Sequence, residues 1–207
     1  MKSKIIFVFL CSSLLCNGCY PQSPNSKMIS NELTRHGATL LVRNSGNDDS
    51  LYLAINLLDS AIKLDSTNYN SLAIKCQIEC TLGKYEEAIK DINHILSIKK
   101  DYLVIKAAKG FIYEKMGNRN QAEKVYKEVL NDYNEKIKSD SNSIDDEINR
   151  NFIILLLDKD AGIKAFEILH KSYPNNKNIN DLHETYYQFD REKFISSFCM
   201  GDVIKGK

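Results

Sequence analysis

Two cysteines four residues apart come nearest to a metal-binding pair in this chain. Cys76 and Cys80 share one face of a predicted helix, where two thiolates can bind one metal ion. This spacing is awkward for a disulfide, and a buried thiol also packs well as a small apolar side chain. Gly110 occupies the position equivalent to Cys76, 34 residues later in a repeated pattern, which favours packing. Including Cys199, three cysteines follow the N-terminal segment, so at least one thiol stays unpaired and no disulfide framework is implied.

The four histidines show no catalytic or zinc-binding pattern. None stands in an HExxH motif, and no Cys/His pair has zinc spacing. The chain has neither a glycine-rich phosphate loop nor a GxSxG elbow. His94 is predicted to be a partly buried packing residue. We therefore predict no metal and no cofactor, and an enzyme is the least favoured class of function.

The composition indicates one helical domain of ordinary size. Of 207 residues, 43% are hydrophobic and 27% are charged, with only 3 prolines and 9 glycines to break helices. The formal net charge of +1 lacks the strong positive excess of nucleic-acid-binding surfaces, so no nucleic-acid partner is predicted.

The first nineteen residues have the organisation of an export signal. Lys2 and Lys4 precede an apolar run that is too short to span a bilayer, and Gly18 stands directly before Cys19. The segment resembles a bacterial lipoprotein signal, which implies that Cys19 becomes the lipidated first residue. An ordinary secretory signal and an uncleaved anchor remain the alternatives. Residues 19–30 are predicted to form a flexible tether.

Small residues recur at a fixed interval in the middle of the chain. Ala54, Ala88 and Ala122 are 34 residues apart, and so are Gly83 and Gly117. Neighbouring columns repeat in register: Leu58, Ile92 and Tyr126; Ala61, Ile95 and Val129; Ile62, Leu96 and Leu130. A period of this length is typical of a solenoid of stacked helix pairs.

The stretch from Leu82 to Ala88 resembles the inter-helix turn of the tetratricopeptide repeat (TPR) family. Gly110, Tyr113, Gly117, Ala122 and Tyr126 fall on that family's signature positions. The resemblance implies an all-α, right-handed solenoid of antiparallel helix pairs, with about four pairs and a C-terminal capping helix. The glycines should end helices in the left-handed conformation.

The solenoid is expected to occupy residues 31–207, after a signal at 1–18. The predicted repeats are 31–68, 69–102, 103–138 and 143–174, followed by C-terminal helices within 177–200. The predicted helices are Ile29–Val42, Leu51–Leu64, Tyr69–Leu82, Ala88–Ile98, Leu103–Met116, Ala122–Tyr133, Ile144–Leu157, Lys159–Tyr173, Ile179–Phe189 and Glu192–Met200.

Three irregular features accompany these helices. An enlarged turn is expected at Asn44–Ser50 and a long polar link at Asn134–Asn142. Ala161, Ala165, Ile168 and Leu169 are expected on the inner face of their helix. Aromatic residues in the last two helices are interpreted as a cap on the open end, with a partner-binding patch as the alternative.

The first helices of TPR pairs line a concave groove, and the resemblance places candidate partner-binding residues there. The candidates are Asn70, Gln77, Thr81, Val104, Phe111, Glu114 and Lys115. Phe111 is the one large aromatic among them, either a binding anchor or a packing residue. Ala73, Val104 and Ala108 stand where some members place polar residues that bind a terminal carboxylate.

The predicted function is a scaffold or adaptor in the bacterial cell envelope, on the outer membrane or the periplasmic face. A lipid at Cys19 would hold it to the membrane, and the groove would bind a peptide or partner protein. Alternatives are an immunity lipoprotein that neutralises a toxin and a lipoprotein of envelope assembly.

Overall fold

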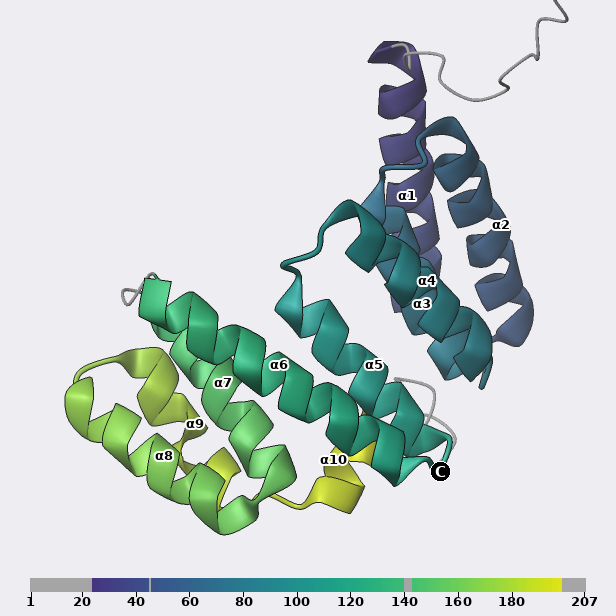
Figure 1. Ribbon diagram of the computed structural model, residues 1–207. Coiled ribbons are helices and arrows are strands. Elements are labelled where there is room, and N and C mark those ends of the chain that lie inside the picture. The colour runs from purple at the N-terminus through teal and green to yellow at the C-terminus, as the bar shows by residue number, and fades with distance from the viewer. Residues whose placement is uncertain (1–23, 45, 140–142, 199–207) are drawn as a thin grey trace, which may run out of the picture.

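The computed structural model describes residues 24–44, 46–139 and 143–198, and these residues form ten helices and no strand (Figure 1). The helices are α1 (Pro24–Asn44), α2 (Asp48–Leu64), α3 (Tyr69–Thr81), α4 (Tyr85–Ile98), α5 (Leu103–Lys115), α6 (Arg119–Ser139), α7 (Ile144–Leu157), α8 (Lys159–Ser172), α9 (Lys177–Tyr187) and α10 (Arg191–Ser197). Consecutive helices α1 to α8 pack as pairs, and each pair stacks on the next. The predicted all-helical solenoid of stacked helix pairs is confirmed.

Identical turns separate the helices of the second and third pairs. Gly83 and Gly117 have φ angles of 74° and 73°, in the left-handed region that glycine enters without a steric penalty. The Gly83 N–H donates to the Cys80 carbonyl at 3.1 Å, and the Gly117 N–H donates to the Glu114 carbonyl at 2.8 Å. These bonds satisfy carbonyls that a helix end leaves without partners.

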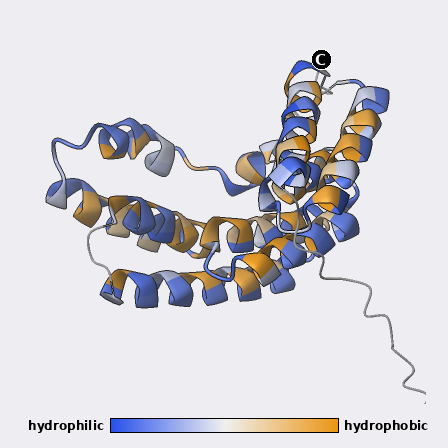
Figure 2. Cartoon of the chain, turned by 90° about the horizontal axis from the view of Figure 1, so that it is seen from above, coloured by the Kyte–Doolittle hydropathy of each residue, from blue (hydrophilic) through white to orange (hydrophobic). Residues whose placement is uncertain are grey.

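The repeated small residues lie where helices approach closely. Ala54, Ala88 and Ala122 are all fully buried. A Cβ atom at Gly110 would lie 2.3 Å from the ring of Tyr126, so only glycine fits beside this tyrosine. In Figure 2, hydrophobic residues gather along the sides on which neighbouring helices face each other.

The predicted tether is wrong over residues 24–30, because α1 begins at Pro24. Ser30 is fully buried, and its hydroxyl donates to the Ala61 carbonyl at 2.9 Å. Asn68 donates from Nδ2 to Ser30 Oγ at 2.9 Å and to Thr34 Oγ1 at 3.2 Å. This buried polar network holds α1 to the start of α3. Residues 19–23 lie outside the described part.

Several predicted connections are also too long. Helix α2 begins at Asp48 with Asn47 as its N-cap, which shortens the expected turn at Asn44–Ser50. The expected polar link at Asn134–Asn142 is mostly helix, since α6 continues to Ser139. Likewise α4 begins at Tyr85, three residues before the predicted start at Ala88, and α6 contains the predicted helix core Ala122–Tyr133.

The inner face of α8 was predicted one residue out of register at its start. Ala161 is exposed and Ile168 is 67% exposed, whereas Gly162, Phe166 and Leu169 are buried. A Cβ atom at Gly162 would lie 2.3 Å from the Cα atom of Leu155, so α8 approaches the backbone of α7 at this glycine.

The two C-terminal helices pack against different parts of the solenoid. Helix α9 packs on α8 and buries Ile179 and Tyr186, as expected of a cap. Helix α10 instead folds back to α5 (Figure 1). Its residue Ile195 is buried and Phe194 packs against the same core cluster.

Candidate functional site: the groove between α3 and α5

The first helices of the second and third pairs enclose an apolar groove. A cavity of about 340 Å³ lies between α3 and α5 and is open to solvent at Val104, which is 52% exposed. We call this cavity the α3–α5 groove. Its lining consists of Ala73, Ile74, Cys76, Gln77, Cys80, Val104, Ile105, Ala108, Phe111, Ile112 and Phe198. Within this lining the side-chain amide of Gln77 is the strongest hydrogen-bonding group.

Of four predicted partner-binding residues, Asn70, Gln77, Thr81 and Val104, the groove is lined by Gln77 and Val104. Gln77 is exposed and lines the groove together with Val104. Thr81 is half-buried, and its hydroxyl donates to the Gln77 carbonyl at 2.9 Å. Asn70 is exposed but does not line the cavity. Of these four, Gln77 and Val104 are therefore directly available to a ligand.

Phe111 forms part of the groove wall and is only 8% exposed. Its ring lies 5.7 Å from Tyr126, 5.3 Å from Phe194 and 4.8 Å from Phe198, measured between centroids. Tilted and edge-to-face aromatic pairs of this kind add to the stabilisation from burial. Phe111 therefore already has intramolecular partners, and its role as a partner anchor stays a prediction.

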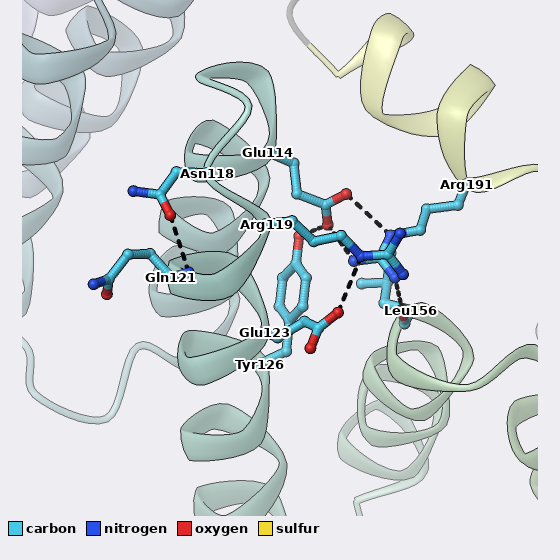
Figure 3. Close-up of polar contacts among 8 residues, drawn as sticks. All are labelled: Glu114, Asn118, Arg119, Gln121, Glu123, Tyr126, Leu156 and Arg191. Carbon is cyan, nitrogen blue, oxygen red and sulfur yellow. Dashed lines mark hydrogen bonds and ion pairs between the residues drawn. The ribbon is translucent and has the colours of Figure 1, made fainter.

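Glu114 binds Arg191 of α10 (Figure 3), and Lys115 also forms a bond to α10. Arg191 donates to Glu114 through Nε at 3.0 Å and through Nη2 at 2.9 Å. The Tyr126 hydroxyl donates to the same carboxylate at 2.7 Å. Lys115 donates from Nζ to the Ser196 carbonyl at 2.7 Å. These contacts place α10 against the C-terminal end of α5, and Phe198, directly after α10, lines the groove.

A partly buried charge cluster around Lys75 was not foreseen from the sequence. Lys75 Nζ lies 2.9 Å from Asp59, 3.3 Å from Asp91 and 3.5 Å from Glu79. Burial, with the nearby charge of Asp91, raises the pKa of Glu79 to about 7. The carboxylates come from α2, α3 and α4, so only the packing of three helices assembles the cluster. The 34-residue spacing of Lys75 and Lys109 was the one sequence feature that pointed to this cluster.

The cysteines have different environments. Cys76 is a free, buried thiol whose pKa burial raises to about 12, which agrees with a core residue. Cys80 is disulfide-bonded, although the sequence implied no disulfide framework. No group of three or more His, Cys, Asp or Glu that could hold a metal occurs in the described part of the chain. Cys19 lies outside the described residues.

Two further findings concern the described part of the chain. His94 is exposed, so the prediction that it is partly buried is wrong; its position on α4 turns it away from the core. None of the helices between residues 24 and 198 combines the length and apolar character needed to cross a membrane.

Comparison with known proteins gives the class of fold. Residues 105–131, which span most of α5 and the first half of α6, match the tetratricopeptide repeat family. A tetratricopeptide repeat protein from Parabacteroides merdae has a similar structure, with a TM-score of 0.54 and 18% identity. That alignment covers 85% of this chain and 63% of the other, so this chain spans less than two thirds of that protein's length.

A TPR protein from Thermus thermophilus aligns with a TM-score of 0.52 and 14% identity, over 86% of this chain and 91% of the other. No curated protein matches the sequence significantly. The chain thus has a tetratricopeptide-repeat sequence match in its third helix pair and the fold of a TPR protein.

Proposed function

We propose that this protein is a membrane-anchored adaptor that binds a short segment of a partner protein in the α3–α5 groove. The observation that carries the proposal is the apolar cavity of about 340 Å³ between the first helices of two successive helix pairs, open at Val104. Concave apolar pockets with a few polar groups are the usual form of ligand sites.

The chemistry of the groove favours a ligand with apolar side chains. Burial of apolar surface supplies about 25 cal/mol per Å², so aliphatic or aromatic side chains are the groups the groove can retain. Gln77 offers one amide that can donate to and accept from a peptide backbone. Glu114 and Lys115 are engaged with α10, so these two charged groups already have intramolecular partners.

The lipid anchor is the second part of the proposal and rests on Gly18 and Cys19. Acyl chains contribute about 0.8 kcal/mol per buried methylene group, so two or more chains give stable membrane attachment. The adaptor would act in the bacterial cell envelope, at the outer membrane or its periplasmic face. Cys19→Ser should abolish incorporation of labelled palmitate and move the protein from the membrane fraction to the soluble fraction. Full membrane retention without labelling of the wild type would overturn the anchor.

Site-specific photocrosslinking tests groove binding. A photoreactive amino acid replaces Val104 in the groove or, as the control, Lys127 on α6, which faces away from it. The full chain is expressed in its native cell. We expect a crosslinked partner from position 104 that is absent from position 127 and is lost when Gln77→Glu is added. Identical products from both positions would contradict groove binding.

A further inference from the structure

Helix α10 contacts the solenoid through one face, as an amphipathic helix does when it is bound in a groove. Arg191, Phe194 and Ile195 are spaced as neighbours on a helix surface, and Phe198 continues this face with helical backbone angles. All four are at least partly buried, whereas the residues between them, Glu192, Lys193, Ser196 and Ser197, are exposed. A helix that lies in a groove is read by anchors of this spacing.

Helices α5 and α7 supply the surface on which this face lies. The Phe198 ring is 4.8 Å from Phe111, and the Phe194 ring is 5.3 Å from Phe111 and 5.0 Å from Phe152, measured between centroids. Arg191 binds the Glu114 carboxylate and the Leu156 carbonyl (Figure 3). We call this surface the α10 seat; it consists of Phe111, Glu114, Lys115, Phe152 and Leu156. Phe111 also lines the α3–α5 groove, so the two surfaces are continuous.

Open crevices flank α10 on its seat. One of about 440 Å³ is lined by α10 and by the segment from Glu114 to Arg119. Another, of about 210 Å³, is lined by α10 and by the end of α9. Since protein interiors are close-packed, each crevice removes dispersion contacts that a core helix would have. A helix of seven residues also has little stability by itself. Release of α10 should therefore cost less free energy than release of a helix of the stacked pairs.

We propose that α10 and Phe198 are an intramolecular ligand, which an amphipathic helix of the partner protein displaces from the α10 seat. This proposal rests on the proposed function, because the displacing helix belongs to the partner segment that binds the α3–α5 groove. Phe198 lines that groove, so displacement also takes its ring out of the lining and opens more apolar surface to the partner. The chain's own last helix thus competes with the partner.

The chemistry of the seat selects the partner helix. The Glu114 side chain is only 11% exposed, and a buried carboxylate without a cation is costly, so the incoming helix must present a basic residue. Arginine fits best, because its fork can bind both carboxylate oxygens as Arg191 does. Phe111 and Phe152 favour aromatic side chains three and seven residues after this arginine. Lys115 can donate to a carbonyl in the last turn of the helix.

A peptide of residues 188–198 tests exchange at the seat. The peptide carries fluorescein at its N-terminus, and fluorescence anisotropy measures its binding to the full chain. One receptor is the wild type, and the other carries Arg191→Ala and Phe198→Ala, which weaken its own α10 and leave every residue of the seat in place. We expect the variant to bind the peptide about tenfold more tightly, because a tethered helix competes at a high effective concentration.

The controls separate seat binding from unspecific association. A peptide of the same length with alanine in place of Arg191, Phe194 and Phe198 should bind neither receptor measurably. Adding Glu114→Gln to the variant should weaken binding of the native peptide about tenfold, because the charge pair is lost. Phe198→Ala alone is the second receptor should the double variant fail to fold. Equal affinity of the native peptide for wild type and variant, or of both peptides for the variant, would overturn the proposal.

The photocrosslink from position 104 distinguishes this proposal from the proposed function. In the native cell, Arg191→Ala should raise the yield of crosslinked partner about threefold, because the competing helix is weakened. Lys177→Ala breaks an exposed ion pair on α9 and should leave the yield unchanged. An adduct whose yield does not respond to Arg191→Ala would overturn displacement and retain groove binding. No adduct from either chain would overturn groove binding itself. Wild-type dimers that Phe198→Ala abolishes would assign the seat to a second copy and overturn the partner helix.

Discussion

Replacing Arg191 should release α10 from the solenoid. The guanidinium group donates two bonds to Glu114 on α5, and a third, from Nη1 to the Leu156 carbonyl at the end of α7, measures 2.6 Å (Figure 3). One side chain therefore joins three helices that are far apart in the sequence. The side chains of Arg191 and Glu114 are only 19% and 11% exposed.

The size of the expected loss in unfolding free energy follows from this burial. Removing one partner of a buried pair typically costs about 3–5 kcal/mol, whereas an exposed pair contributes about 0–1 kcal/mol. Glu114 keeps its bond from the Tyr126 hydroxyl, which lowers the penalty of leaving its charge without Arg191. We expect Arg191→Ala to reduce the free energy of unfolding by about 3 kcal/mol. Arg191→Lys keeps the charge but cannot form the two-pronged contact, and should lose about half as much.

Urea unfolding of the full chain measures this loss, and hydrogen exchange should show the fastest opening in α10. Lys177→Ala is the matched control, because it breaks an exposed pair with Asp181 whose side chains are 86% and 61% exposed. That variant should lose less than about 0.5 kcal/mol.

A double-mutant cycle decides whether the pair itself is responsible. Arg191→Ala and Glu114→Gln, alone and together, should give a coupling energy of about 2 kcal/mol. A coupling below about 0.5 kcal/mol, or an Arg191→Ala loss no larger than that of Lys177→Ala, would refute the reasoning.

Three other predictions concern the core. Gly162→Ala should lose about 2 kcal/mol of unfolding free energy in urea titration, because overpacking against the α7 backbone outweighs the gain in helix propensity; an unchanged midpoint would contradict the close approach. Asn68→Ala should lose about 3 kcal/mol, since it removes a helix cap and two buried hydrogen bonds, whereas Asn47→Ala removes only an exposed cap and should lose about 1 kcal/mol; equal losses would count against the network. The raised pKa of Glu79 means that the folded state binds a proton between about pH 4.5 and 7 that the unfolded state has released, so stability falls as pH rises through this window. Glu79→Gln cannot ionise and should gain on the order of 2 kcal/mol relative to wild type between pH 5 and pH 8, and a pH-independent difference would exclude the effect.

The sequence determined those features that local signals encode. Gly83 and Gly117 end helices through bonds that reach back only a few residues, and the columns around Ala88 and Ala122 repeat with the helix pairs. Such signals can be recognised without knowing the fold, because a left-handed turn or a close helix contact restricts the residue type at one position. The order of the helices and most of their bounds follow from them.

Where the 34-residue period is weaker, the predicted buried positions differ from the observed ones. Gly162 is the small residue at the close helix contact of the fourth pair, but it does not continue the alanine column, so Ala161 was assigned to the core instead. At the other end, Ser30 reads as a polar linker residue, and only its buried partners show that it belongs to a helix.

Only the tertiary structure decided where the last helix lies. The bond from Arg191 to Glu114 joins residues 77 positions apart, and Phe198 meets Phe111 across a similar separation. No local pattern encodes such a contact, because it depends on the summed curvature of the intervening helix pairs and on the turn before α10. The sequence by itself therefore determined a helical-repeat solenoid with a candidate groove. The tertiary structure decided that Glu114 and Lys115 bind the chain's own last helix, and that Gln77 and Val104 remain open to a ligand.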